Sequence, residues 1–460
     1  MCSLSLSTSL PLSLSLSLSL FRTHSVMHPL LFPCLHTRAA ANPLLPSPHS
    51  FTPPSNSLLL HPLVLKSLYP NIEPPPPPMP PPCFEAASPC IFSDTLTFTS
   101  KNLLTQRSKQ TDSPLLRSAS RPARSIIMAP TIPKGSTVLV TGVTGFIASH
   151  VADQLLQAGY NVRGTSRTKA KTEWMDKLFT EKYGANRFEC YEVPDMMSDT
   201  AFDAAAKGVS GIAHLASILT FSNNVDEVIP PTVKGTLNIL KSASKEPSIK
   251  SVVYTSSSTA ALLPQPNTPL TITQETWNDA ALAMAQQPDP DGFVVYGASK
   301  TAAEKAFWQT IAATNPPFQT SAVLPNTNFG PILDGGEGTS TGSFPGKLWK
   351  GDTSMMDMLP PQYFVDVRDT ARLHVAALID PQCAGQRIFA FASPFNWHDV
   401  LGIFQKIQPE GKFPEPPQDE GRDLSRVPNA EAEALLKKHF GQGWVGLEES
   451  LRENVKGLSG

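Results

Sequence analysis

A short apolar run passes into a glycine-containing turn and then into a helical pattern near residue 140. The stretch reads VLVTGVTGFIA over residues 138–148, with Gly142, Gly145 and Ala148 in and after the turn. The first glycine permits a tight turn, the second lets the backbone approach a ligand, and the alanine allows close helix packing. Free N–H groups at the start of the helix suit phosphates, which predicts a dinucleotide site, although glycines after a strand also occur in simple turns.

Composition separates residues 1–127 from the rest of the chain. This segment holds 21 of the 46 prolines, the run SLSLSLSLSL and consecutive prolines at 74–78. It lacks the hydrophobic periodicity of helices or strands, which predicts a disordered tail. The sequence from Met128 resembles a complete natural beginning, so the upstream residues are either an extension of the gene model that is absent from the mature protein or a disordered tail.

Residues 1–127 also bear on where in the cell the protein is located. Polar and apolar residues alternate over residues 2–20 with no basic residue ahead of them, so the stretch is typical neither of a signal peptide nor of a membrane-spanning helix. We therefore expect a cytoplasmic protein without a membrane partner. Arg22 and Arg38 among many serines, with no acidic residue before Glu73, leave a mitochondrial transit peptide as the alternative.

Charge and cysteine content exclude further classes of protein. Residues 1–127 contain nine Lys and Arg against four Asp and Glu, so residues 128–460 must carry −7 to give the whole-chain charge of −2. This acidic balance argues against a nucleic-acid partner. Cys190 and Cys383 are the only cysteines after residue 127 and form no C-x-x-C pattern, so we expect reduced thiols and no metal site.

From residue 128 onward, short β-branched runs alternate with longer amphipathic segments. A helix is expected over 148–157, and strands over 137–140, 161–165, 188–193, 211–215, 251–255, 320–324 and 387–391. This alternation predicts an α/β fold with a doubly wound, mostly parallel sheet. The Gly-rich stretch 334–343 predicts a mobile loop that could act as a lid.

A tyrosine and a lysine stand four residues apart in YGASK, which opens an Ala-rich helix running to about residue 313. Tyr296 and Lys300 therefore share one helix face. Lowering a tyrosine pKa by about two units requires about 2.7 kcal/mol, and a charge at about 4 Å contributes about 4 kcal/mol at an effective dielectric of about 20. The pair is thus a candidate acid or base, although such pairs also occur on ordinary surface helices.

A run of hydroxyl residues, TSSS at 255–258, follows the apolar strand expected at 251–255. The carboxyl edge of a parallel sheet is where such folds present functional groups, so one of these hydroxyls could hold a carbonyl oxygen. Serines after a strand are also common turn formers.

Together, strand-TGxxGxxA, strand-TSSS and YxxxK resemble the extended short-chain dehydrogenase/reductase superfamily, also called the NAD-dependent epimerase/dehydratase family. The stretches GYNVRGTSR, GIAHLAS, AVLPN and PPQYFVDVRD add to the resemblance, which extends from residue 128 to the C-terminus. It is greatest to fungal aldehyde and methylglyoxal reductases, and weaker to dihydroflavonol reductase. The resemblance implies a Rossmann domain over 128–326 and a smaller substrate lobe over 327–460, with segments that return to the Rossmann domain.

The resemblance also implies roles for individual residues. Tyr296 would be the general acid, Lys300 would lower its pKa and bind the nicotinamide ribose, and Ser257 would orient the carbonyl, with Ser256 and Ser258 as less favoured registers. The other cofactor-contacting positions would be Thr141, Gly142, Gly145, Phe146, Ile147, Asp195, Met196, Ala216, Ser217, Pro325 and Asn326.

The end of the second expected strand bears on the choice of cofactor. NAD-selective proteins of this fold place an acid there to bind the ribose 2′-hydroxyl. This strand closes instead on Gly164-Thr165-Ser166-Arg167, with Lys171 four residues further on. Two cations suit a 2′-phosphate, so we predict NADPH, unless Arg167 and Lys171 are merely solvated. His214 is expected to be a strand histidine that faces a neighbour.

The smaller lobe should close over the substrate. Phe221 and Tyr363 are the predicted apolar lining residues, together with Met355, Met356 and Met358 unless these methionines are core. The segment FVDVRD at 364–369 resembles a family segment that returns to the Rossmann domain. We expect Asp366 and Asp369 to be structural and Arg368 to pair with one of them.

The predicted function is NADPH-dependent reduction of a small aldehyde or ketone by a monomer or homodimer. Two alternatives remain. A nucleotide-sugar epimerase or dehydratase on the same fold would favour tightly held NAD and a larger lobe. A non-catalytic NADPH-sensing protein would typically lack the tyrosine or the lysine, and both are present here.

Overall fold

The structure is a computed structural model that describes residues 129–336 and 338–458. The predictions for residues 1–127 lie outside the described residues. None of the described helices is both long and apolar enough to cross a membrane.

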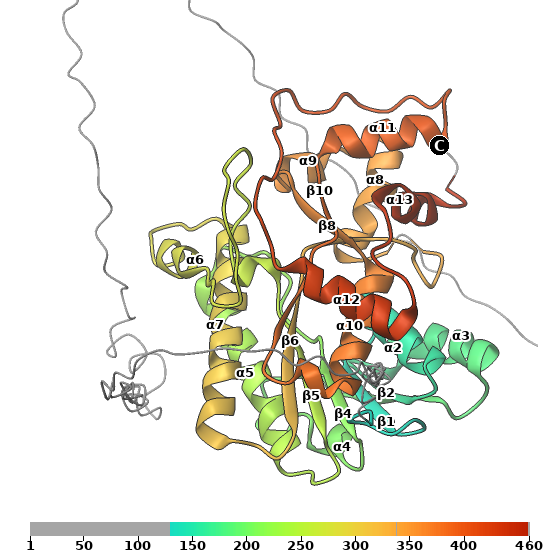
Figure 1. The fold of residues 1–460 in the computed structure, drawn as a ribbon, viewed down its shortest axis with the longest axis vertical. Coiled ribbons are helices and arrows are strands. Elements are labelled where there is room, and N and C mark those ends of the chain that lie inside the picture. Colours follow the sequence, from blue (N-terminus) through green and yellow to red (C-terminus); the bar gives the residue numbers. More distant parts are fainter. Residues whose placement is uncertain (1–128, 337, 459–460) are drawn as a thin grey trace, which may run out of the picture. The chain divides into compact units, whose positions relative to one another are not determined.

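A seven-stranded sheet, ordered β3-β2-β1-β4-β5-β6-β9, forms the larger part of the fold (Figure 1). Every neighbouring pair in it is parallel. Its strands are β1 (Thr137–Thr141), β2 (Asn161–Ser166), β3 (Phe188–Glu192), β4 (Gly211–His214), β5 (Ser251–Thr255), β6 (Gln319–Pro325) and β9 (Arg387–Ala390). The predicted strands and the doubly wound sheet are confirmed, with small differences at strand ends.

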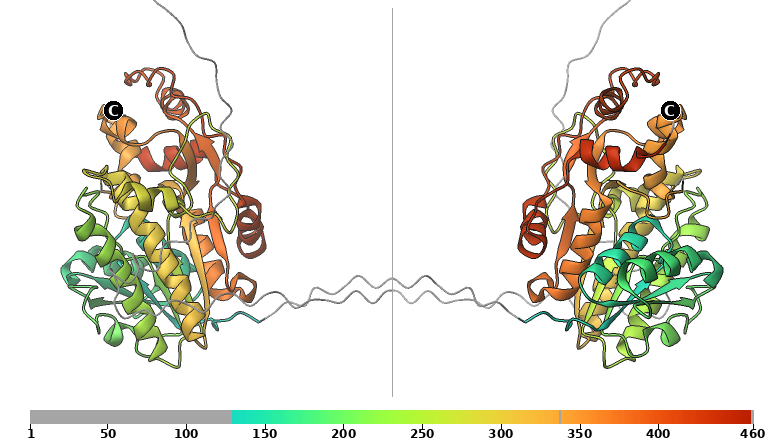
Figure 2. Two further views of the ribbon diagram at one scale, coloured as in Figure 1. Left: turned by 90° about the vertical axis from the view of Figure 1, so that its left-hand side faces the viewer. Right: turned by 90° about the vertical axis from the view of Figure 1, so that its right-hand side faces the viewer.

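Helices cover both faces of this sheet, which explains why the central strands are apolar along their whole length. Helices α5 (Val225–Ser244) and α7 (Gly292–Thr314) pack together on one face. Helices α2 (Phe146–Gln157), α10 (Val367–Ile379) and α12 (Asn429–Phe440) cover the other, as Figures 1 and 2 show. Shorter elements complete this layer structure: α3 (Glu173–Tyr183), α4 (Asp203–Ala206), α6 (Asp279–Met284), η1 (Lys169–Thr172), η2 (Ser258–Ala260) and η4 (Pro381–Cys383).

The chain order fixes where a ligand can bind. From β1 the chain moves outward to β2 and β3, and then returns to place β4 on the other side of β1. In sheets of this type the crevice at such a reversal, outside the carboxyl ends of the strands, is the usual binding position. Thr141 and His214 end β1 and β4 in register with each other, so they mark this crevice.

A second, three-stranded sheet was not anticipated from the sequence. It has the order β10-β8-β7 and is built from β7 (Thr327–Phe329), β8 (Gln362–Asp366) and β10 (Ser393–Phe395). Around it lie η3 (Ser340–Ser343), α8 (Phe344–Trp349), α9 (Ser354–Met358), α11 (Trp397–Ile407) and α13 (Leu447–Val455). We call this part the small lobe. The chain beyond residue 327 also contributes α10, β9 and α12 to the large sheet and its helical layers.

Several local predictions need correction. The helix expected at 148 begins at Phe146, and the helix expected to open at Tyr296 begins at Gly292, because the Asp291 side chain accepts the N–H groups of Phe293 and Val294 and caps it. Residues 340–343 of the predicted loop form a 3-10 helix.

The methionine cluster does not act as a common lining. Met355 is buried in the apolar core of the small lobe and Met356 packs against that core, whereas Met358 is exposed. Met355 and Met356 are therefore core residues, the alternative that the sequence had left open.

Other structural expectations are confirmed. Asp366 caps α10 by accepting the N–H of Arg368, and its carboxylate also pairs with the Arg368 guanidinium at 2.8 Å. Asp369 is fully buried and accepts the N–H of Val445 at 2.7 Å. Cys190 is half-buried and Cys383 is buried, and both are free thiols.

Candidate active site

The turn after β1 is fixed by contacts to the end of β4. The Thr141 hydroxyl accepts the N–H groups of Leu215 and Ala216 at 2.9 and 3.0 Å and hydrogen-bonds to Nδ1 of His214 at 2.9 Å. Gly142 has φ +64°, and a Cβ there would lie 3.1 Å from Cα of Ala216. Only glycine combines this conformation with such a close approach. The contact with Thr141 confirms that His214 faces a neighbouring strand.

The start of α2 has the properties of an anion site. Gly145 is the residue before the helix and offers no side-chain cap, so the first N–H groups of the helix, beginning with Phe146 and Ile147, remain available for an anion. Nearby, the buried Ser217 hydroxyl has no hydrogen-bond partner among the described residues. A phosphate-bearing ligand with polar groups therefore fits the residues present at this crevice.

The basic pair follows β2 as predicted. Arg167 and Lys171 are both exposed, and neither forms an ion pair with another described residue. Glu192, at the end of the adjacent strand β3, is the carboxylate close to this turn. Its side chain accepts the N–H of Lys169 at 2.6 Å, so it orders the backbone between the two cations.

The loop after β3 is held by α5, which the sequence reasoning missed. Asp195 accepts the N–H of Met197 at 2.8 Å. Asn238 donates its amide to the carbonyl oxygens of Met196 and Ser198 at 3.0 and 2.9 Å. A Cβ at Gly235 would lie 3.0 Å from Sδ of Met196. The signal in the sequence was a glycine inside a long helix, followed three residues later by an asparagine.

The three serines after β5 have different partners. Ser256 donates to the Glu304 carboxylate at 2.6 Å, away from the tyrosine. Ser257 is buried and accepts the Thr259 hydroxyl at 3.0 Å, and its hydroxyl is the one that lowers the pKa of the Tyr296 phenol. Ser258 begins η2. Among these three, Ser257 is therefore the hydroxyl that the structure brings to Tyr296.

The electrostatics of the Tyr-Lys pair differ from the expectation. Burial raises the pKa of the Tyr296 phenol, and the hydrogen bond with Ser257 opposes this only in part. Lys300 is 4% exposed, and burial lowers the pKa of its ammonium to about 8. Its Nζ lies 5.9 Å from the Tyr296 ring centroid and reaches the Thr255 carbonyl at 3.5 Å. Lys300 is thus desolvated and directed to backbone, so burial determines the phenol's pKa and Tyr296 stays protonated near neutral pH.

Aromatic rings form one wall beside Tyr296. The Phe221 ring lies 5.0 Å from the Tyr296 ring, and Phe293 stacks at 6.5 Å from Phe221. Phe221 is 40% exposed, and Gly292 is required beneath it because a Cβ there would lie 2.1 Å from the Phe221 carbonyl oxygen. Tyr363 has a different environment. It is buried, packs on Phe391 and donates to the carbonyl of Ser425 at 2.9 Å.

Pro325 ends β6, the strand next to β5, and Asn326 follows it; both are buried. The Asn326 side chain accepts the N–H of Thr327 at 2.8 Å, which turns the chain out of the large sheet toward the small lobe.

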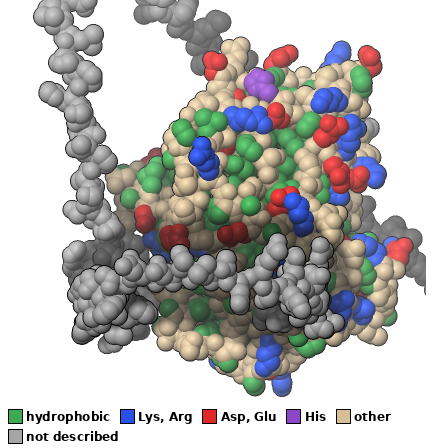
Figure 3. Space-filling view, in the orientation of Figure 1, with side chains coloured by type: hydrophobic (Ala, Val, Ile, Leu, Met, Phe, Trp, Pro, Cys, Tyr) green, Lys and Arg blue, Asp and Glu red, His purple; other side chains and the backbone are tan. Residues whose placement is uncertain are grey.

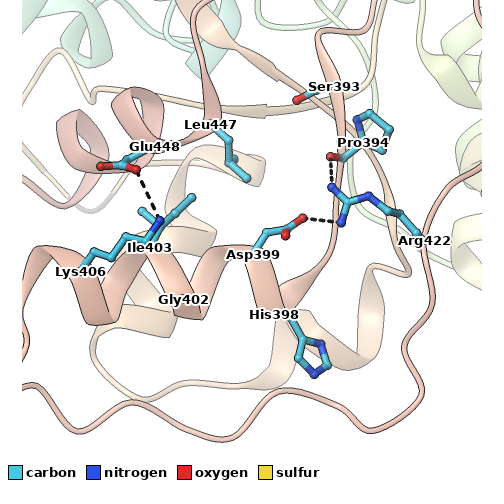
Figure 4. Close-up of a pocket in the computed structure, with 10 residues that line it drawn as sticks. All are labelled: Ser393, Pro394, His398, Asp399, Gly402, Ile403, Lys406, Arg422, Leu447 and Glu448. Atoms are coloured by element: carbon cyan, nitrogen blue, oxygen red, sulfur yellow. Dashed lines mark hydrogen bonds and ion pairs between the residues drawn. The ribbon is translucent and has the colours of Figure 1, made fainter.

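A separate open groove of about 510 Å³ lies on the small lobe, between α11, β10 and the start of α13 (Figure 4). Its charged side chains are paired, with Arg422 at 2.9 Å from Asp399 and Lys406 at 3.9 Å from Glu448. No predicted site residue lines this groove. Elsewhere on the face shown in Figure 3, acidic and basic side chains are interspersed.

The chain is similar to a known protein family and to individual fungal proteins. The family model of the NAD dependent epimerase/dehydratase family matches residues 138–389. Aldehyde reductase 2 of Sporidiobolus salmonicolor is 40% identical over 333 residues, which covers 70% of this chain and 96% of that protein. Ketoreductase adrE of Penicillium rubens is 42% identical over 330 residues, covering 70% of this chain and 97% of the relative.

Solved structures agree with these relatives. Yeast methylglyoxal/isovaleraldehyde reductase Gre2 complexed with NADPH is 28% identical with a TM-score of 0.60, covering 69% of this chain and 97% of that one. Gre2 from Candida albicans, also complexed with NADPH, is 30% identical with a TM-score of 0.61, covering 70% and 98%. The resemblance inferred from the motifs is confirmed: the chain belongs to the NAD dependent epimerase/dehydratase family.

Proposed function

We propose that this protein is an NADPH-dependent reductase that converts an aldehyde or ketone to an alcohol. One observation carries the proposal. A protonated tyrosine, Tyr296, interacts with the buried Ser257 at the carboxyl edge of the sheet that also carries the turn after β1. The names of the relatives, an aldehyde reductase and a ketoreductase, support the same reaction.

The chain's own residues account for the proton in this reaction. Ser257 and Tyr296 hold the substrate oxygen from two directions. A dihydronicotinamide held in this crevice would supply the hydride for the carbonyl carbon. Tyr296 gives its proton to the oxygen, so the carbonyl becomes an alcohol and the tyrosine a phenolate. The ammonium of Lys300, whose pKa is about 8, is mostly charged near neutral pH and stabilises that phenolate before solvent returns the proton.

We assign the cofactor-holding groups from their positions in the crevice. The pyrophosphate would meet the turn from Thr141 to Ile147, through Gly142, Gly145 and Phe146. Asp195 and Met196 would border the adenine, Arg167 and Lys171 the 2′-phosphate, and Lys300 the ribose. Ala216, Ser217, Pro325 and Asn326 would border the nicotinamide. The missing acid after β2 and the NADPH complexes of the Gre2 proteins support NADPH over NADH.

The wall beside Tyr296 indicates the kind of carbonyl. Phe221 and Phe293 present apolar surface next to the proton donor, which favours a substituent with apolar or aromatic character. Tyr363, by its contacts, has a packing role and is not assigned to the substrate. We retain the cytoplasm as the proposed site of action.

The proposal is tested by following NADPH oxidation by the purified full chain with small aldehydes, 2-oxoaldehydes, ketoesters and aryl ketones. We expect turnover of at least one class, with the alcohol formed in equal amount. If no carbonyl is reduced while a nucleotide sugar is epimerised or dehydrated, the family's other reaction class is correct. NADPH binding with no turnover of either kind would indicate a sensing protein.

A further inference from the structure

Glu304 is the buried carboxylate closest in sequence to the proposed catalytic pair, and the proposed mechanism does not use it. It lies on α7 one turn after Lys300 and is fully buried. Its oxygens accept hydrogen bonds from Ser256 at 2.6 Å, from Trp308 at 3.2 Å, and from two nitrogens of Arg387 at 2.7 and 3.3 Å. One carboxylate therefore joins the helix of Tyr296, the strand end of Ser257 and the edge strand β9.

The Arg387 side of this cluster is rigid. Nη1 of Arg387 donates to the carbonyl oxygens of Gln274 and Thr276 at 2.8 and 2.7 Å. The guanidinium also lies 3.9 Å above the Trp277 ring. A bidentate arginine held in this way fixes the Glu304 carboxylate as well.

The contact with Ser256 transmits this rigidity to Ser257. The N–H of Ser256 bonds to the Val323 carbonyl on β6 at 2.9 Å, and its hydroxyl is anchored by Glu304. Ser257 follows in extended conformation, with φ −157° and ψ 156°. Ser256 directly precedes Ser257, so anchoring Ser256 at both its N–H and its hydroxyl fixes the backbone from which the Ser257 side chain projects.

The charge of Glu304 acts on Lys300. Burial lowers the pKa of Lys300, and Glu304 is the group whose charge opposes this. The other titratable groups around Lys300 are Tyr296, His214 on β4, Tyr254 on β5, and His374 on α10, which bonds to Thr255. None of them is an anion near neutral pH, because burial raises the pKa of both tyrosines and lowers that of both histidines. The charged residues of α5 and α6 that flank α7 are exposed: Asp226, Glu227, Lys234, Lys241 and Asp279.

We propose that Glu304 is a positioning residue for this site, which keeps the buried Lys300 ammonium charged and, through Ser256, directs Ser257 toward Tyr296. The inference rests on the proposed reductase function. An ion pair kept for packing alone has no need to place one carboxylate both in contact with the serine run and one helical turn from the buried lysine, and buried pairs contribute little net stability.

The test is the Glu304→Gln variant, which keeps the shape of the side chain and removes its charge. We measure kcat/KM for NADPH against pH at saturating carbonyl, because this ratio reports groups of the free enzyme. Wild type should lose activity as Lys300 deprotonates near pH 8. Without the opposing anion the pKa of Lys300 falls further. The alkaline limb of the pH profile, where kcat/KM declines, should therefore shift to lower pH by about one unit or more. A folded Glu304→Gln variant whose limb stays in place overturns the proposal.

Two variants separate the two effects. Ser256→Ala keeps the charge of Glu304 and loses the anchor, so kcat should fall while the alkaline limb stays. Glu304→Asp keeps the charge with a shorter reach, so the limb should return to its wild-type position. Trp308→Phe is the matched control: it removes one hydrogen bond to Glu304 and leaves both charge and anchor, and it should change neither quantity. A limb that moves equally in Trp308→Phe and Glu304→Gln would show a merely structural role.

Further controls distinguish a failure of the Glu304 inference from misfolding of the variant and from a failure of the proposed reductase function. If Glu304→Gln does not fold with Arg387 unpaired, the double variant Glu304→Gln/Arg387→Gln removes both buried charges; the alkaline limb should move in the same direction but less far, because loss of the guanidinium offsets part of the lost negative charge. The alkaline limb is also measured as the pH dependence of NADPH affinity by quenching of protein fluorescence, which needs no turnover. Binding with this limb but without reduction of any carbonyl contradicts the proposed reaction, whereas an unmoved limb in the variant contradicts the role of Glu304.

Discussion

Burial beside the proposed site changes the pKa values of individual side chains. It raises the pKa of Tyr296 and lowers that of Lys300, so both side chains are shifted toward their neutral forms. The motif placed the two groups on one helix face, and it could not reveal that burial outweighs the effect of the lysine on the phenol. Desolvation depends on α5, β4 and β5 packed around them, and these are not local in sequence.

The residues after β2 give a prediction on cofactor selectivity. Replacing Arg167 and Lys171 together by Ala should weaken NADPH binding by about tenfold or more, because two charge-assisted contacts to the 2′-phosphate are lost. NADH affinity should change by less than about twofold, since NADH lacks that phosphate. Fluorescence titration with both cofactors measures the difference, and Lys250→Ala, an exposed lysine at the amino end of β5, is the control. Equal losses for both cofactors would remove the assignment.

His374 gives a prediction on stability against pH. It is fully buried, bonds to Thr255 at 2.8 Å and to the Thr370 carbonyl at 2.8 Å, and burial lowers its pKa to about 4. Between pH 6.5 and 4, the His374 imidazole binds a proton in the unfolded state but remains neutral in the folded state. This residue therefore removes stability as pH falls, by about 1.4 kcal/mol per pH unit. His374→Asn should flatten the urea-unfolding free energy over this range by that slope, and an unchanged slope would contradict the assignment.

Secondary-structure elements show which parts of the fold are readable from sequence. The seven strands of the large sheet were predicted because each is a short run with apolar or β-branched residues, and helical stretches lie between most of them. The strands of the small sheet were not, because β7 and β10 have only three residues and pair with β8 from distant parts of the chain. The start of α7 at Gly292 depended on the Asp291 cap, which precedes the apparent motif.

Helix α5 gives a prediction on cofactor binding without chemistry. Asn238→Ala removes both hydrogen bonds to the loop carbonyls of Met196 and Ser198. The loop proposed to border the adenine should loosen, which should raise the dissociation constant for NADPH by about tenfold and leave kcat within about twofold. Ser244→Ala, which removes an intrahelical bond at the end of the same helix, is the control. A fall in kcat with unchanged affinity would place Asn238 in another role.

At the scale of the whole molecule, the residues that stabilise the fold differ from those proposed to contact the substrate. Trp397 is 1% exposed in the core of the small lobe, and its Nε1 donates to the Leu359 carbonyl at 3.0 Å. Trp397→Ala should cost about 3 to 5 kcal/mol of unfolding free energy. Phe221→Ala, at an exposed ring beside Tyr296, should cost less than about 0.5 kcal/mol and raise KM for aryl carbonyls. Denaturant unfolding and steady-state kinetics on both variants check this division, and a stability loss at Phe221 matching that at Trp397 would contradict it.

The site as a whole was partly readable. The turn after β1, the serine run and the Tyr-Lys pair carry local patterns, so their residues were named from sequence. Glu304, Asn238 and Phe293 were not, because each acts through contacts between elements far apart in the chain. The hydrogen bond from the Tyr363 hydroxyl to the Ser425 carbonyl could not be predicted either, because only the folded chain brings these residues together.

The central claim is that Tyr296 donates the proton to a carbonyl reduced at this site. The direct measurement is a single turnover of NADPH-loaded enzyme mixed with a carbonyl that wild type reduces, for wild type and Tyr296→Phe. We predict equal NADPH affinity in the two proteins and a loss of about 10²-fold to 10⁴-fold in the rate of NADPH oxidation in the variant. Equal oxidation rates in the two proteins would contradict the claim.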